Sequence, residues 1–280
     1  MNYRHGFHAG NFADVLKHAI FLACLDHLAL KDKPFAAIDT HAGAGVYDLS
    51  GVEAQKTGEW RDGIGRLLDA ADAPPLVARY VAAIRSAQSV GFEGMTLYPG
   101  SPRLALQALR AADRMTAIEL HPPSAGLLTA ALNGQRNARI MQTDGYAALA
   151  RTVPPPEKRG LVLIDPPFEN PDEFERLAGA VKEAYDRWET GTILAWYPVK
   201  DANAAARFEA ELQSHAIPNM LAAGLTVMAP SERMASCAMI VINPPFTLFP
   251  ALEAQLPWLT ERLAKGPGAG FRLAWLGAPE

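Results

Sequence analysis

Short apolar runs alternate with helix-length segments along most of the chain. Seven of these runs predict strands: 35–39, 115–120, 139–143, 161–164, 192–196, 225–228 and 239–242. Near-continuous apolar strands that alternate with helices are typical of a parallel sheet buried on both faces. The pattern therefore predicts a Rossmann-like α/β fold with a seven-stranded, mostly parallel sheet and room for antiparallel pairing at its end. Ligands of such sheets bind at the carboxyl ends of the strands.

The first helix is predicted over residues 11–30. Leu16, Ile20, Ala23 and His27 recur at steps of four and three, which indicates an amphipathic helix. Asn11 stands before it as the N-cap, with Asp14 as an acidic residue in the first turn.

About seventy residues separate the first strand from the second, far more than one crossover helix needs. Within this interval Leu76, Tyr80 and Ile84 lie at steps of four, which favours a helix, and Ser101-Pro102 is typical of the start of another. We therefore expect a single domain, 1–280, that carries an inserted helical subdomain, 47–98.

The loop after the first strand contains Gly43-Ala44-Gly45, where the backbone must turn tightly. A dinucleotide fingerprint, G-x-G-x-x-G, would place a third glycine where the chain has Asp48. A carboxylate there disfavours a pyrophosphate, whereas a nucleoside cofactor without phosphate tolerates it. Gly43 is a candidate cofactor contact, although a glycine pair alone also fits an ordinary tight turn.

Two further strands end on acidic residues. A carboxylate at the tip of the second strand, Glu119, is suited to accept hydrogen bonds from ribose hydroxyls. Asp144-Gly145 follows the third strand, where the carboxylate can take an adenine amino group and the glycine allows close approach. Each residue alone fits an exposed acidic loop equally well, but three strand ends in register favour a nucleoside site.

The fourth strand stops at Asp165-Pro166-Pro167-Phe168. A carboxylate and a proline-fixed carbonyl can accept both N–H groups of an exocyclic amine and aim its lone pair at an electrophile. An aromatic ring can stack on an extruded base. The pattern indicates methylation of a planar amino nitrogen, with Asp165, Pro166 and Phe168 as catalytic residues. A twin, Asn243-Pro244-Pro245-Phe246, follows the seventh strand and is expected at the far edge of the sheet.

Composition narrows the picture further. The 280 residues are 49% hydrophobic, the net charge is -4, and the two cysteines, Cys24 and Cys237, both lie in apolar segments. The charge argues against non-specific coating of nucleic acid. No apolar run has the roughly 20 residues of a membrane helix. We expect a cytoplasmic protein with reduced cysteines.

The N-terminal segment combines rings and polar groups. His5 and His8 with Asp14 and His18 have a spacing that a metal site could use, but methyl transfer requires no metal, and none is expected. Lys17 and His18 are instead expected to face a cofactor carboxylate or solvent. Trp196-Tyr197-Pro198 after the fifth strand is a candidate wall of the target pocket or an ordinary packed loop.

Several strings resemble the bacterial RlmJ family, whose members methylate N6 of one adenine in 23S ribosomal RNA. They are Tyr3-Arg4-His5, Phe7-His8-Ala9-Gly10-Asn11, Ala13-Asp14-Val15-Leu16-Lys17-His18, Asp39-Thr40-His41-Ala42-Gly43-Ala44-Gly45, Tyr98-Pro99-Gly100-Ser101-Pro102, Glu119-Leu120-His121-Pro122 and Ile164-Asp165-Pro166-Pro167. The similarity continues through Ile242-Asn243-Pro244-Pro245 and covers essentially the whole chain.

The resemblance implies the class I methyltransferase fold and S-adenosyl-L-methionine as cofactor. It implies cofactor contacts from His18, His41, Ser101, Glu119, Asp144, Gly145 and Asp165, with Asp165 catalytic and Tyr3 meeting the RNA. Phe168 departs from the family, whose motif usually ends in Tyr. The expected partner is 23S ribosomal RNA free of ribosomal protein, bound by a monomer.

Four other readings stay open on sequence. A DNA adenine-N6 or a protein glutamine-N5 methyltransferase would face the same electronic problem. An NAD-dependent oxidoreductase is disfavoured by Asp48. A non-catalytic RNA-binding protein with a vestigial nucleoside pocket is the fourth.

Overall fold

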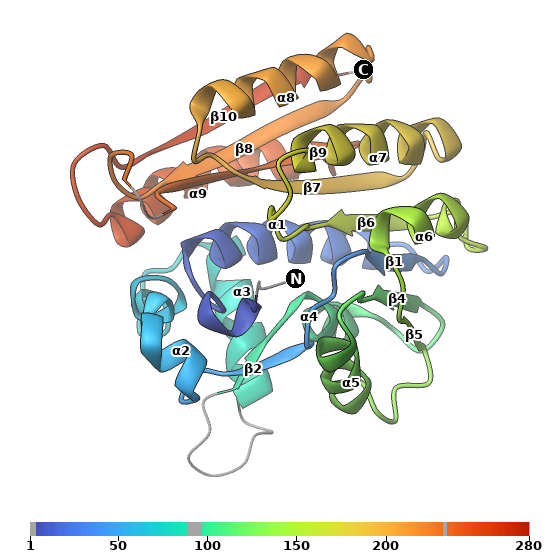
Figure 1. Cartoon of the computed structure of the whole chain (residues 1–280), viewed down its shortest axis with the longest axis horizontal. Coiled ribbons are helices and arrows are strands. Elements are labelled where there is room, and N and C mark those ends of the chain that lie inside the picture. Colours follow the sequence, from blue (N-terminus) through green and yellow to red (C-terminus); the bar gives the residue numbers. More distant parts are fainter. Residues whose placement is uncertain (1–3, 89–96, 232–233, 280) are drawn as a thin grey trace.

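The computed structural model describes residues 4–88, 97–231 and 234–279. Within these residues, eight strands form the main sheet in the order β10-β8-β9-β7-β6-β1-β4-β5 (Figure 1). Their bounds are β1 (Ala36–Asp39), β4 (Arg114–Ile118), β5 (Ala138–Met141), β6 (Gly160–Ile164), β7 (Thr192–Pro198), β8 (Met220–Thr226), β9 (Ser236–Ile242) and β10 (Gly270–Gly277).

Strand directions divide the sheet into two parts. β5, β4, β1, β6 and β7 run parallel to one another, whereas β9, β8 and β10 join by antiparallel pairing. The predicted Rossmann-like α/β fold with a mostly parallel sheet is confirmed. The prediction of seven strands was wrong, because β10 is a half-exposed edge strand whose apolar run is interrupted by Arg272. β8 begins at Met220 rather than at 225, since the alanines and glycine of its first half carry little strand signal.

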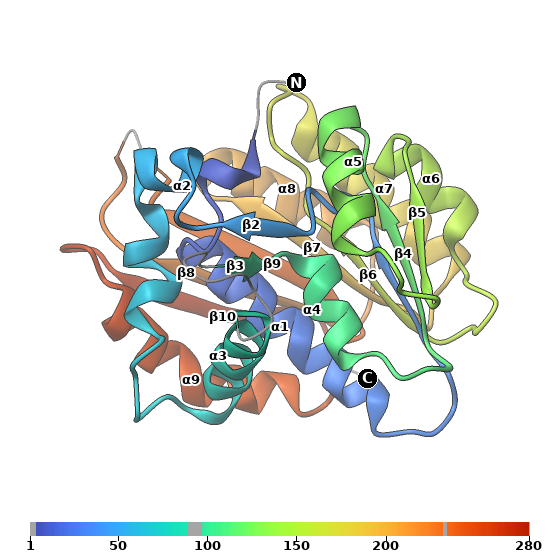
Figure 2. The same ribbon diagram turned by 90° about the horizontal axis from the view of Figure 1, so that it is seen from below.

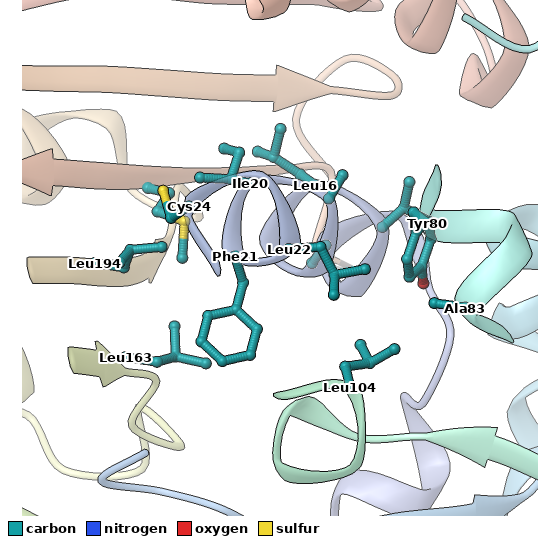
Figure 3. Packing of buried hydrophobic residues seen from close by; sticks show 14 of the residues in the cluster. Leu16, Ile20, Phe21, Leu22, Cys24, Tyr80, Ala83, Leu104, Leu163 and Leu194 are labelled. Atoms are coloured by element: carbon teal, nitrogen blue, oxygen red, sulfur yellow. The ribbon is translucent and has the colours of Figure 1, made fainter. Parts of the chain in front are cut away.

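Helix α1 (Phe12–Ala29) lies at the centre of the molecule, against one face of the sheet. Asn11 caps it as predicted, because its side chain accepts the N–H groups of Ala13 and Asp14. The helix is not amphipathic: residues 11–22 are all buried. Figure 3 shows why, since Leu16, Ile20, Phe21 and Leu22 point toward different neighbouring elements around the helix.

Helices cover both faces of the sheet. Those on the face of α1 are α3 (Pro75–Gln88), α4 (Ser101–Ala108), α5 (Pro122–Ala131) and α9 (Leu248–Leu263). The opposite face carries α6 (Gly145–Thr152), α7 (Glu173–Arg187) and α8 (Ala202–Ser214). The result is a three-layer arrangement with one apolar core on each side of the sheet (Figure 1).

The segment between β1 and α4 is framed by a short antiparallel ribbon, β2 (Val46–Asp48) and β3 (Leu97–Pro99). Between them lie α2 (Val52–Thr57), the 3₁₀ turns η2 (Glu59–Asp62) and η3 (Ile64–Arg66), and α3 (Figure 2). Ile64, Val77 and Tyr80 of this segment join the same apolar core as α1. The division of 47–98 into a subdomain therefore stays a prediction.

The ribbon explains the missing third glycine of the first loop. The chain leaves Gly45 directly into β2, so no helix N-terminus follows the loop there. The helix that leads back to β4 is α4, which begins only at Ser101. Asp48 ends β2 and accepts hydrogen bonds from the Ser50 backbone N–H at 2.8 Å and from its hydroxyl at 2.6 Å.

One edge of the sheet gathers the loops that matter for function. The carboxyl ends of the parallel strands point to it, and Pro198 at the end of β7 pairs with Cys237 at the start of β9. The β8–β9 connection therefore lies at the same edge. Both cysteines are free and buried, as predicted. Among the described helices, none combines the length and apolar character that crossing a bilayer demands.

Candidate active site

A cleft of about 1090 Å³ opens along this edge of the sheet. It is lined by every described residue that the sequence proposed for the site: His18, His41, Gly43, Ser101, Glu119, Asp144, Gly145, Asp165, Pro166 and Phe168. Tyr3 lies outside the described residues. His5 and Gly6 of the N-terminal turn η1 (His5–Phe7) also line the cleft.

Glu119 is fixed by the loops on either side of it. Its Oε2 accepts the backbone N–H of Gly43 at 2.8 Å, and its Oε1 accepts that of His121 at 2.7 Å. Gly43 has φ 61°, a left-handed conformation, and a side chain there would collide with the Tyr47 hydroxyl. The carboxylate of Glu119 is thus held at the tip of β4, with remaining lone pairs for a ligand.

Asp144 and Gly145 form the start of α6. Asp144 caps the helix by accepting the Ala147 N–H at 2.9 Å, and its other oxygen lies 3.4 Å from Arg176. A Cβ at Gly145 would stand 2.1 Å from the Thr40 carbonyl oxygen. Only glycine therefore lets α6 approach the end of β1 this closely.

Two histidines line the cleft as neutral rings. Burial lowers the pKa of His18 to about 3 and that of His41 to about 4. The Nδ1 of His18 lies 2.8 Å from the Tyr98 hydroxyl, and the Nδ1 of His41 lies 2.8 Å from the Thr40 hydroxyl. Each ring is thus oriented by a hydroxyl partner.

Ser101 does not cap α4 by its side chain; the N-cap is Gly100. The serine lies instead beside Asp39, which is fully buried at the end of β1 and accepts the His41 N–H at 3.2 Å. Burial raises the pKa of Asp39 to about 7, and the Ser101 hydroxyl offsets only part of this rise.

Asp39 therefore makes a specific contribution to the pH dependence of stability. Its pKa is about 7 in the folded protein and about 3.9 in an unfolded chain. The stabilisation by its protonated form is complete below about pH 4 and is lost as the pH rises through 7, with a slope of at most about 1.4 kcal/mol per unit. Asp39→Asn is expected to remove this slope. Urea unfolding of the wild type and of Asp39→Asn at pH 5, 6, 7 and 8 measures this. The same dependence of the free energy of unfolding on pH in both proteins would contradict the expectation.

Asp165, at the end of β6, contacts a buried lysine of α1. The Nζ of Lys17 lies 2.5 Å from Asp165 Oδ2 and 2.8 Å from Asp14 Oδ1, and the lysine side chain is 5% exposed. Burial alone would lower the pKa of Lys17, but the two carboxylates raise it well above its usual value. The lysine is therefore a fixed cation, and the expectation that it faces solvent was wrong.

Asp14 connects this pair to the N-terminal turn. It accepts the Gly10 N–H at 2.8 Å and lies 3.0 Å from the Nε2 of His5. Burial alone would raise the pKa of Asp14, yet His5 and Lys17 beside it lower the pKa well below its usual value. The described residues contain no cluster of three or more metal-ligating side chains.

The His5–Asp14–Lys17–Asp165 series was not predicted from the sequence. Its one sequence signal was the i, i+3 spacing of Asp14 and Lys17, which puts both on one helix face. Asp165 lies 148 positions from Lys17, so no local pattern relates them.

Phe168 is the last residue of the Asp165–Phe168 loop, which we call the reaction loop. It has φ 49°, an uncommon conformation for a residue with a large side chain, and this places its ring at the cleft wall. The ring makes edge contacts with Phe174 at a centroid distance of 4.9 Å and with Trp196 at 6.0 Å.

The twin motif at Asn243 lies elsewhere, for a reason that differs from the predicted one. β9 is not at the far edge of the sheet but between β7 and β8. Because β9 runs antiparallel to β7, its carboxyl end lies at the opposite edge from the cleft. There the Asn243 side chain donates to the carbonyls of Glu189 at 2.7 Å and Gly191 at 2.9 Å, which is a structural role.

Comparison with known proteins agrees with this geometry. A family model described as ribosomal RNA large subunit methyltransferase D, RlmJ, matches residues 32–277. This chain belongs to the RlmJ family. The ribosomal RNA large subunit methyltransferase J of Haemophilus influenzae is 40% identical over 278 residues, and that of Escherichia coli is 37% identical; each comparison covers 99% of both chains.

A crystal structure of a Legionella pneumophila protein shares the RlmJ fold of this chain. It superposes with a TM-score of 0.86 at 33% identity, covering 95% of this chain and 98% of that one. The resemblance that the N-terminal string and the strand-end motifs indicated is thereby confirmed.

Proposed function

We propose that this protein transfers a methyl group from S-adenosyl-L-methionine to N6 of one adenine in 23S ribosomal RNA, releasing S-adenosyl-L-homocysteine. Membership of the RlmJ family supports the substrate class. The observation that carries the chemistry is Asp165 in the cleft lining, with one carboxylate oxygen on Lys17 and the ring of Phe168 in the same loop. Membership of the RlmJ family does not favour the alternatives of a DNA adenine methyltransferase, a protein glutamine methyltransferase or a nicotinamide-dependent oxidoreductase.

The cleft residues fit a nucleoside cofactor. Glu119 is held where it can accept from ribose hydroxyls, Asp144 where it can accept from an adenine amino group, and the glycine at 145 permits close approach of the ring. When bound, S-adenosyl-L-methionine supplies an electrophilic methyl group that is carried on a sulfonium cation.

The acceptor nitrogen is positioned by Asp165 and Pro166. Because Lys17 binds Asp165 Oδ2, the Oδ1 atom is left to accept one N–H of the adenine amino group, and the Pro166 carbonyl accepts the other. This draws the nitrogen lone pair toward the methyl group. The nitrogen gives up its proton toward Oδ1 as its positive charge develops, so no strong base is required.

Phe168 is expected to stack on the extruded base. Base–aromatic stacking is worth about 1–3 kcal/mol, so Phe168→Ala is expected to raise the KM for RNA roughly 5- to 150-fold. Phe168→Tyr is expected to keep the wild-type value. The exposed Phe246 of the twin motif gives a matched control, and Phe246→Ala is expected to change nothing. Equal effects at the two positions would contradict the assignment.

Labelled methyl transfer tests the proposal against its rivals. The purified chain is offered 23S ribosomal RNA free of ribosomal protein, assembled large subunits, duplex DNA and a protein fraction, with Asp165→Ala as the blank. We expect labelling of the free RNA alone, by a monomer without added metal. Transfer to DNA or protein would support those rivals, and RNA binding without transfer would support the vestigial pocket.

A further inference from the structure

The cleft extends well beyond the reaction loop. Its volume of about 1090 Å³ exceeds the roughly 300–1,000 Å³ typical of a site for one small molecule. Residues along it run from Asp144 after β5 to Met228 after β8. Adjacent strands are about 4.8 Å apart, so β8, three strands from β6, lies roughly 14 Å beyond the strand of Asp165. That distance is more than one base occupies.

The two halves of the cleft differ in chemistry. The half on the β1–β4–β5 side carries the carboxylates of Glu119, Asp144 and Glu173. The other half, which we call the outer half, is lined along the sheet edge by Trp196, Pro198, Lys200, Met228 and Met234. Apolar and aromatic surface beside a lysine suits bases and phosphates rather than a second polar cofactor.

Three other acids that line the cleft, Glu53, Glu59 and Asp62, each have a basic partner. Glu53 pairs with Arg4 at 3.0 Å, and Glu59 lies 3.0 Å from the Nδ1 of His8. Asp62 is shared by Lys265 and Arg66, each at 2.8 Å. Lys200 is exposed and forms no ion pair with any side chain in the described ranges. A polyanion therefore meets little net repulsion there.

Trp196 stands at the entrance to the outer half. It lies on β7, next to the strand of Asp165, and its ring meets that of Phe168 at 77° with centroids 6.0 Å apart. Lys17 Nζ lies 6.0 Å from the centroid of the same ring. Tyr197 turns to the opposite face and packs on Phe208. Phe168 and Trp196 thus form a corner of two aromatic walls beside Asp165.

We infer that the outer half is the track for an unpaired stretch of RNA: Trp196 is the second wall of the target-base pocket, Met228 and Met234 receive a neighbouring base, and Lys200 binds a phosphate. Only unpaired bases expose faces that can stack in this way. Methionine side chains adapt to different bases, so the neighbouring position is expected to tolerate sequence changes. The identity of the target base rests on the proposed function.

Equilibrium binding tests the track without any methyl transfer. Protein loaded with S-adenosyl-L-homocysteine is titrated with a labelled single-stranded RNA of about eight nucleotides, and with the same strand annealed to its complement. We expect the single strand to bind more tightly. Trp196→Ala is expected to weaken this binding roughly 5- to 150-fold. Trp275→Phe is the control. Trp275 lies in β10, where its ring stacks on Phe249 of α9, and it is not part of the cleft lining.

Salt dependence tests the phosphate contact. Lys200→Gln is expected to reduce the slope of log K against log salt by roughly one phosphate contact, about 0.7 for a single strand. Lys182→Gln on α7, where Lys182 pairs with Asp186, is expected to leave the slope unchanged. Melting temperatures show whether each variant is folded, and Met234→Ala provides a second, smaller truncation should Trp196→Ala unfold.

The proposal of an RNA track is overturned if the duplex binds as tightly as the single strand. It is also overturned if Trp196→Ala and Met234→Ala both bind the single strand as tightly as Trp275→Phe does. These outcomes are separable from failure of the proposed function. Single-strand binding that depends on Trp196, with no methyl transfer, would defeat only the proposed function. Transfer to ribosomal RNA that is indifferent to Trp196 would defeat only the track.

Discussion

Asp165→Asn is expected to lower kcat by at least about 10²–10³-fold, because the amide loses the charge that stabilises the developing ammonium-like nitrogen. Its Oδ2 is the atom that Lys17 holds at 2.5 Å, so the amide also presents a poorer partner to the lysine. Cofactor binding is expected to persist in part, because Asp165 is only one of the expected cofactor contacts and Glu119, Asp144 and the glycine loop are untouched. Single-turnover transfer and calorimetric binding of S-adenosyl-L-methionine measure the two effects separately.

The control for this change is Asp186→Asn. Asp186 is exposed on α7 and lies outside the cleft. We expect wild-type turnover from it. A wild-type kcat for Asp165→Asn, or a loss of cofactor binding large enough to account for the whole loss of turnover, would contradict the assignment of Asp165 to the reacting nitrogen.

Asp14→Ala is expected to lower the free energy of unfolding by about 3–5 kcal/mol, because it removes one partner of a buried ion pair. The change strips Lys17 of one of its two carboxylates and leaves the Gly10 N–H without its acceptor. Asp26→Ala on the same helix is the control. Its side chain is 40% exposed and pairs with Arg79 at the surface, so a loss of at most about 1 kcal/mol is expected.

The carboxylate of Asp14 also makes the free energy of unfolding depend on pH in the acidic range. The pKa of Asp14 is lowered in the folded protein, so its contribution is complete above the unfolded value near 4 and is lost as the pH falls below it. Urea unfolding of both variants between pH 3 and 7 measures this. Equal losses for Asp14→Ala and Asp26→Ala would contradict the buried role of Asp14.

The residues that the sequence located best are those at strand ends. Asp165, Glu119 and Asp144 each follow an apolar run, and parallel strands bring such ends to one edge whatever the details of packing. All three line the cleft, as the pattern implied. Their roles toward cofactor and RNA stay predictions that the experiments above test.

What the sequence could not reveal depends on long-range packing. Helix α1 was predicted to be amphipathic, since periodicity cannot show that helices α3, α4 and α9 and the sheet surround it. For the same reason Lys17 was placed toward solvent or a ligand instead of on Asp165. The left-handed backbone of Phe168 has no sequence signature, because large residues adopt it only when their surroundings impose it.

The twin motif shows where the correct answer rested on the wrong reason. Order along the chain placed Asn243 at the far edge, whereas strand direction is what removes it from the site. Antiparallel insertion of β9 between β7 and β8 could not be read from a run of apolar residues, which looks alike in either direction.

The most direct test of the central claim is nucleoside mapping of 23S ribosomal RNA from cells with and without the gene for this protein. We predict that one adenine loses its N6-methyl group in the deleted strain. The purified enzyme with S-adenosyl-L-methionine is expected to restore that group on the extracted RNA, and the Asp165→Asn variant is not. An unchanged pattern of N6-methyladenine in the deleted strain would contradict the account.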